Sequence, residues 1–122
     1  MAEMREIHEF AVKYYSLYVH PQTIEREVEE GFGDKCFALG FEMDCGNRFI
    51  DSFSVDAFYK YEALDKIIKD IDDVQLLGSA IFSHWRYVTH WAGDSNLLDE
   101  EHRVWFITAF RRLAVITEES DN

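Results

Sequence analysis

The sequence predicts one α+β domain that is mainly helical, with about four principal helices and a short β-hairpin packed on them. Over most of the chain, apolar residues recur at spacings of three and four, the period of an amphipathic helix. Near residue 40 the period changes to two, which is typical of a half-buried strand. The 122 residues suit a single domain, and 48% hydrophobic and 16% aromatic residues are too many for an intrinsically disordered chain.

The first helix is expected over residues 3–18, where one apolar stripe contains Ile7, Phe10, Ala11, Tyr14, Tyr15 and Tyr18. Pro21 ends this helix, because a residue that precedes proline avoids helical dihedrals. A short acidic helix is expected over residues 22–30. Gly31 is expected to end it as a C-terminal glycine.

The β-hairpin is expected from residue 36 to residue 53. Its first strand alternates large apolar residues with Cys36, Ala38, Gly40 and Glu42; the large residues are Phe37, Leu39, Phe41 and Met43. Residues 44–47, Asp-Cys-Gly-Asn, have turn chemistry. Residues 48–53 would return as the second strand.

Three helices are expected in the rest of the chain. Residues 55–71 carry an apolar stripe, with Ser54 as the N-cap. Asp72, with Gln75 three residues later, resembles a capping box that opens a helix running to about Trp91. A final helix is expected from Asp99 to about Ile116, with Phe106, Ala109, Phe110, Leu113 and Ile116 as its core stripe. The acidic tail, residues 118–122, is expected to be disordered.

The helix expected after residue 72 has three faces. One is an ordinary core face, and another contains Ser79, Ser83, Arg86 and His90 and can face water. The remaining face is aromatic, with Ala80, His84, Tyr87 and Trp91. It is either buried inside the domain or shared with a partner. Since Trp, Tyr and Arg are enriched at interface hot spots, the candidate partner-binding residues are His84, Arg86, Tyr87 and Trp91.

The net charge of −12 is unevenly distributed. Residues 1–73 hold 17 acidic and eight basic residues, residues 74–117 hold four of each, and the tail adds three acids. This balance argues against direct binding to nucleic acid or to an anionic membrane. With no signal-peptide pattern and no apolar run of about 18 residues, the sequence predicts a cytoplasmic protein with reduced cysteines.

No pattern for a metal or a cofactor is complete. His8-Glu9 begins the HExxH zinc motif, but Val12 occupies the place of the second histidine. Residues 31–36 resemble a dinucleotide-binding GxGxxG motif, yet Cys36 replaces the last glycine. We therefore expect no cofactor and no metal.

Two segments are similar to stretches in small conserved proteins of intestinal Firmicutes. They are residues 40–46, Gly-Phe-Glu-Met-Asp-Cys-Gly, and residues 79–92, which include Ser-His-Trp-Arg-Tyr and Thr-His-Trp-Ala. Those proteins are often found near mobile elements and are functionally uncharacterised. The resemblance implies a bacterial cytosolic setting and supplies no site residue.

These observations predict a non-enzymatic, acidic protein-interaction domain. In its sharpest form it inhibits a nucleic-acid-handling protein by occupying a basic groove, as phosphate mimics of the anti-restriction or anti-CRISPR type do. A homodimer formed through the aromatic face is a further possibility, and the charge could also serve only solubility. The alternative function is a small cytosolic enzyme that uses Cys45, His84 or His90.

Overall fold

The computed structural model describes residues 4–20, 26–43, 49–50, 64–88 and 100–120, and the structural statements below concern these residues. The labelled helices are α1 (Met4–Val19), α2 (Arg26–Ala38), α5 (Leu64–Ile68), α6 (Val74–Arg86) and α7 (Glu100–Ser120). This part of the chain contains no β-strand and is all-α, so the predicted α+β class is wrong.

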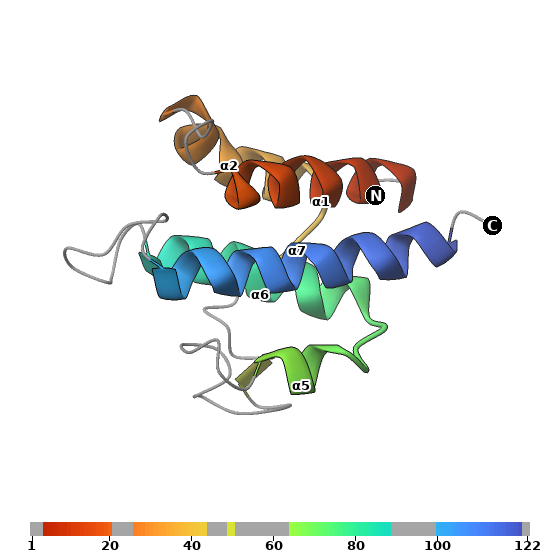
Figure 1. The fold of residues 1–122 in the computed structure, drawn as a ribbon. Helices are drawn as coiled ribbons and strands as arrows, with labels where there is room; N and C mark the ends of the chain where they lie inside the picture. The colour runs from red at the N-terminus through yellow and green to blue at the C-terminus, as the bar shows by residue number, and fades with distance from the viewer. Residues whose placement is uncertain (1–3, 21–25, 44–48, 51–63, 89–99, 121–122) are drawn as a thin grey trace.

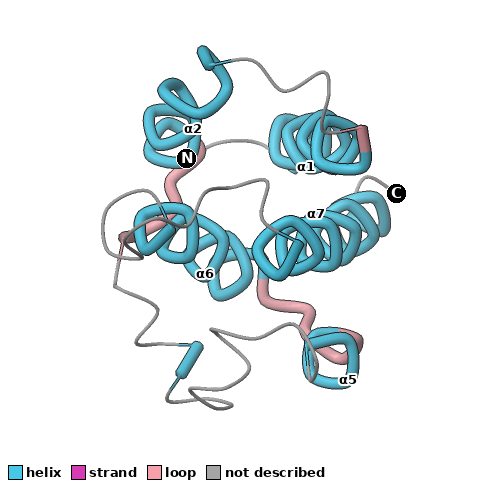
Figure 2. Tube along the Cα trace, turned by 60° about the vertical axis from the view of Figure 1, so that its left-hand side comes forward, coloured by secondary structure: helices cyan, strands magenta, loops and turns pink. Residues whose placement is uncertain are grey.

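The helices lie in layers (Figure 1). α1 and α2 form one layer, α6 and α7 lie side by side beneath it, and α5 lies beyond them (Figure 2). α7 packs against α1, α5 and α6, and α2 packs against α6. None of the described helices is both long and apolar enough to cross a membrane.

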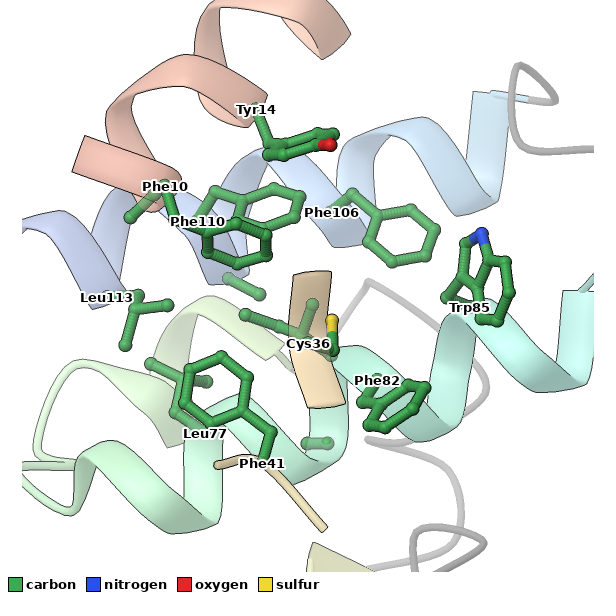
Figure 3. Close-up of a cluster of buried hydrophobic side chains, with 14 of the residues drawn as sticks. Phe10, Tyr14, Cys36, Phe41, Leu77, Phe82, Trp85, Phe106, Phe110 and Leu113 are labelled. Atoms are coloured by element: carbon green, nitrogen blue, oxygen red, sulfur yellow. The ribbon is translucent and has the colours of Figure 1, made fainter. Parts of the chain in front are cut away.

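Aromatic rings form the centre of the core, where α1, α2 and α7 meet (Figure 3). The ring centroid of Phe32 on α2 lies 5.0 Å from that of Tyr14 on α1 and 6.0 Å from that of Phe110 on α7. Fully burying a side chain of this size stabilises the fold by about 1.5–3 kcal/mol. The apolar stripe predicted for the last helix is confirmed, since its five residues are all buried.

The predicted hairpin is replaced by a longer α2. This helix continues through Gly31 and ends at Ala38, because Phe32, Cys36 and Leu39 lie on one helical face and are buried together. The two-residue alternation of apolar side chains over residues 36–43 therefore does not determine which of these side chains are buried. Of the expected return strand, Phe49 and Ile50 are helical; the turn at residues 44–47 lies outside the described residues.

Gly40, rather than Gly31, ends α2. Its φ of +86° lies in the left-handed region, which glycine adopts without steric cost. The Gly40 N–H donates to the Phe37 carbonyl at 3.0 Å, and the Phe41 N–H donates to the Cys36 carbonyl at 3.1 Å. These two bonds make a Schellman motif, which also turns the buried Phe41 back onto the core.

The start of α6 also differs by one residue from the prediction. Asp73 is the N-cap, and its Oδ1 accepts from the backbone N–H of Gln75 at 3.0 Å and of Leu76 at 3.1 Å. Asp72 instead pairs with Arg112 of α7 at 3.1 Å. The preceding helix ends at Ile68 instead of residue 71; the part expected over residues 55–63 lies outside the described residues.

α6 is buried on nearly all sides. Ser79 and Ser83, which were expected to face water, are buried, and the Ser79 hydroxyl accepts from the Glu42 N–H at 3.2 Å. The prediction is wrong for these two serines, and the loop after α2 covers Ser79, whereas Arg86 of the same predicted face is exposed. α7 runs to Ser120, so residues 118–120 are helical rather than part of a disordered tail.

Candidate functional site

His84, the first predicted partner-binding residue, lies inside the core. It is 0% exposed, and its ring stacks on Trp105 of α7 with centroids 4.2 Å apart and an interplanar angle of 3°. Its Nε2 lies 3.2 Å from Nδ1 of His102, so one ring donates and the other accepts. His102 was not singled out from the sequence, because only the packing of α7 on α6 brings the two rings together.

The other predicted partner-binding residues are placed differently. Arg86 is exposed, and Tyr87 is partly buried, with its ring centroid 6.0 Å from that of His84. Trp91 lies outside the described residues. The end of α6 therefore brings Arg86 and part of Tyr87 to the surface, and a partner-binding role there stays a prediction.

Of the residues of the alternative enzyme, His84 lies in the described part of the chain and is buried. Cys45 and His90 lie outside it. His8 contacts α7, where its Nδ1 lies 2.9 Å from the Ala114 carbonyl oxygen and 3.0 Å from Thr117 Oγ1. Within the described residues, no three His, Cys, Asp or Glu side chains are grouped to hold a metal ion.

A large apolar side chain stands on the surface near the end of α2. Phe37 is 78% exposed, and Met43 beyond the helix is 37% exposed. Asp34, one helical turn earlier, and Glu42 are exposed acids. The sequence placed Phe37 among the large apolar residues of a predicted half-buried strand. The signal that could have found it is the stripe of Phe32, Cys36 and Leu39 followed by Gly40, because Phe37 lies off that stripe.

A pocket of about 370 Å³ opens between α1 and α2. Its apolar lining includes Phe10 and Tyr14 from α1 and Leu39 after α2, all buried. Its charged lining is Glu6, Glu9 and Lys13 from α1 and Lys35 from α2. Sequence reasoning missed this pocket, because it depends on how two helices are placed relative to each other.

Burial shifts the pKa of two core groups, Cys36 and Tyr14, of which Tyr14 lines this pocket. Burial raises the pKa of the Cys36 thiol well above its ordinary value. Burial, with a smaller contribution from Cys36, also raises the pKa of the Tyr14 hydroxyl. Both groups therefore stay protonated at neutral pH, and Cys36 is an unreactive thiol of the core.

Comparison of the chain with protein-family models, with curated proteins and with solved structures finds no significant match.

Proposed function

We propose that this protein is a non-enzymatic protein-interaction domain whose contact surface is the end of α2 around Phe37. The observation that carries the proposal is the 78% exposure of Phe37 on a well-formed helix. Leaving a phenylalanine in water forgoes about 1.5–3 kcal/mol of burial free energy, which a partner could recover. An aromatic ring on a rigid element also provides contact area at low entropic cost.

The charges around Phe37 suggest what the partner surface is like. Asp34 and Glu42 are exposed close to it in the chain, in a protein whose net charge is −12. A complementary partner has an apolar depression bordered by Lys or Arg. Basic grooves of this kind occur in proteins that handle nucleic acids, so the sharper proposal is inhibition of such a protein by an acidic surface that competes with phosphate groups.

The test uses purified bacterial nucleases and nucleic-acid-binding regulators, immobilised and titrated with wild-type protein, Phe37→Ser and Val12→Ser. Val12 is the matched control, because it is a 46% exposed apolar residue on α1. We expect Phe37→Ser to weaken binding by about tenfold or more and Val12→Ser by less than about twofold. Binding should weaken as salt rises from about 50 to about 300 mM, and DNA should compete.

Three results would change the proposal. If no panel member binds at low salt, the mimicry form is abandoned. If Phe37→Ser binds as tightly as wild type, the contact surface lies elsewhere. If sedimentation at ~100 μM shows a dimer that Phe37→Ser abolishes, the partner of this surface is a second copy of the chain.

A further inference from the structure

We propose that the pocket between α1 and α2 binds a small zwitterion with an apolar side chain, of the class of the apolar amino acids. This inference goes beyond the proposed protein-interaction function and does not depend on it. Phe37 does not line the pocket, and on the helical wheel of α2 it lies about 160° from Leu39, which does. The volume of about 370 Å³ falls within the ~300–1,000 Å³ that is usual for ligand pockets.

The apolar part of the pocket suits a hydrocarbon side chain. Phe10, Tyr14 and Leu39 belong to the buried core, yet each contributes to the pocket wall. A ligand side chain laid against them would displace water from apolar surface, which is the main favourable term in binding of this kind.

A tyrosine hydroxyl also lines the pocket. The Tyr14 side chain is 3% exposed, and its hydroxyl makes no hydrogen bond with any residue in the described part of the chain. The hydroxyl oxygen itself is not fully buried, so it can donate to a ligand oxygen in place of water. Its raised pKa keeps the proton in place at neutral pH.

The charged side chains that α1 contributes to the pocket are separated by sign along the helix. Glu6 and Glu9 occupy the earlier turns of α1, and Lys13 lies one turn later, about 6 Å further along the axis than Glu9. The Lys13 Nζ is held 5.7 Å from the centroid of the Tyr14 ring, and Lys35 belongs to α2. Within the described residues none of these four forms an ion pair, so both signs of charge are available to a ligand.

This arrangement orients a zwitterion in one direction. The ligand ammonium group would lie toward Glu6 and Glu9, and its carboxylate toward Lys13 and Lys35. Its side chain would cover the apolar wall. A ligand with only one charge would use one half of the site, and charged hydrogen bonds are worth enough to make that difference measurable.

The test compares three probes that share one ring and differ only in charge: L-phenylalanine, phenethylamine and 3-phenylpropionate. Binding is measured by NMR titration that follows the Tyr14 ring and the Leu39 methyl groups. The variants are Lys35→Gln and Glu9→Gln, with Lys66→Gln, an exposed lysine on α5, as the control. Since all three are surface changes, the variants should fold as wild type does.

We expect saturable binding of L-phenylalanine, about tenfold tighter than that of either singly charged analogue. Lys35→Gln should weaken phenylalanine and phenylpropionate and leave phenethylamine unchanged. Glu9→Gln should weaken phenylalanine and phenethylamine and leave phenylpropionate unchanged. The inference is overturned if no probe gives saturable shifts by about 10 mM, if all three bind equally, or if Lys66→Gln has the same effect as the pocket variants.

Discussion

Two positions require glycine because an aromatic ring packs closely against each of them. A Cβ at Gly33 would lie 2.9 Å from Cη2 of Trp85, and one at Gly78 would overlap the ring of Phe41. Both glycines lie inside helices, where glycine costs about 0.5–1 kcal/mol relative to alanine. The close approach of an aromatic ring compensates for this cost. Neither contact could be predicted from the sequence, because the glycine and the aromatic residue of each pair are distant in the chain.

We predict that Gly78→Ala lowers the free energy of unfolding by about 1–2 kcal/mol. The strain of forcing a methyl group against Phe41 costs about 1–3 kcal/mol, and the better helix propensity of alanine returns at most about 1 kcal/mol. The matched control is Gly31→Ala in α2, where a Cβ would meet nothing within 4 Å. Urea unfolding should show Gly31→Ala unchanged or more stable. If the two variants change the free energy of unfolding equally, the contact with Phe41 is not the reason that residue 78 is glycine.

At the scale of the element, the ends of the helices were harder to predict than their faces. The apolar stripes of α1 and α7 follow from spacing alone, since each helix buries one continuous face. Two glycines, Gly31 and Gly40, are candidates for the residue that ends α2. Gly40 was the better one, because Phe41 after it can pack back on Cys36 as the Schellman motif needs, whereas no such contact is available after Gly31.

The start of α6 provides a direct test of one such end. Asp73→Ala should destabilise the protein by about 1 kcal/mol, because it removes the acceptor for two backbone N–H groups. Asp72→Ala removes only a surface pair with Arg112, in which the Asp72 side chain is 86% exposed, and such pairs contribute about 0–1 kcal/mol at most. Thermal unfolding of both variants, with Asp73→Asn as the conservative change, measures the difference. A larger loss for Asp72→Ala would mean that Asp72 is the cap, as its spacing to Gln75 first indicated.

For the whole molecule, stability depends on one aromatic core shared by α1, α2, α6 and α7. Cys36 from α2 and Tyr14 from α1 are protonated members of this core, and burial raises the pKa of both. A thiol or phenol whose pKa is higher in the folded state binds its proton more tightly there than in the unfolded chain. The contribution of each group to the free energy of unfolding is therefore fully present below the pKa of the unfolded chain. It is lost as pH rises from there through the pKa of the folded state.

We predict that the melting temperature falls as pH rises above about 8.5, the ordinary pKa of a thiol, and falls more steeply above about 10, where tyrosine titrates. Cys36→Ala should be less stable at pH 7, because it leaves a small cavity, but its melting temperature should decline less between pH 8 and pH 10. Melting curves followed by circular dichroism in the presence of a reductant measure both. An equally steep decline in Cys36→Ala would show that other groups cause it.

The candidate sites depend on contacts between helices, which residue spacing alone does not reveal. Spacing identified the aromatic face of α6 and left two readings open, a buried face or a shared one. The stacking of His84 on Trp105 and its hydrogen bond to His102 place that residue in the core. Conversely, Phe37 was predicted to be one of the large apolar residues of a half-buried strand, and its exposure could be recognised only once the buried stripe of α2 was known.

The sequence by itself determined that the chain is predominantly helical, that α1 and α7 each bury one stripe, and that the negative charge lies mainly in the first 73 residues and the tail. These properties depend on neighbours within a few residues. The tertiary structure alone decided that residues 36–38 are helical, that His84 is internal, and that a pocket with charges of both signs opens between α1 and α2. Each of these depends on contacts between segments far apart in the chain, and local periodicity carries no information about which helices will meet.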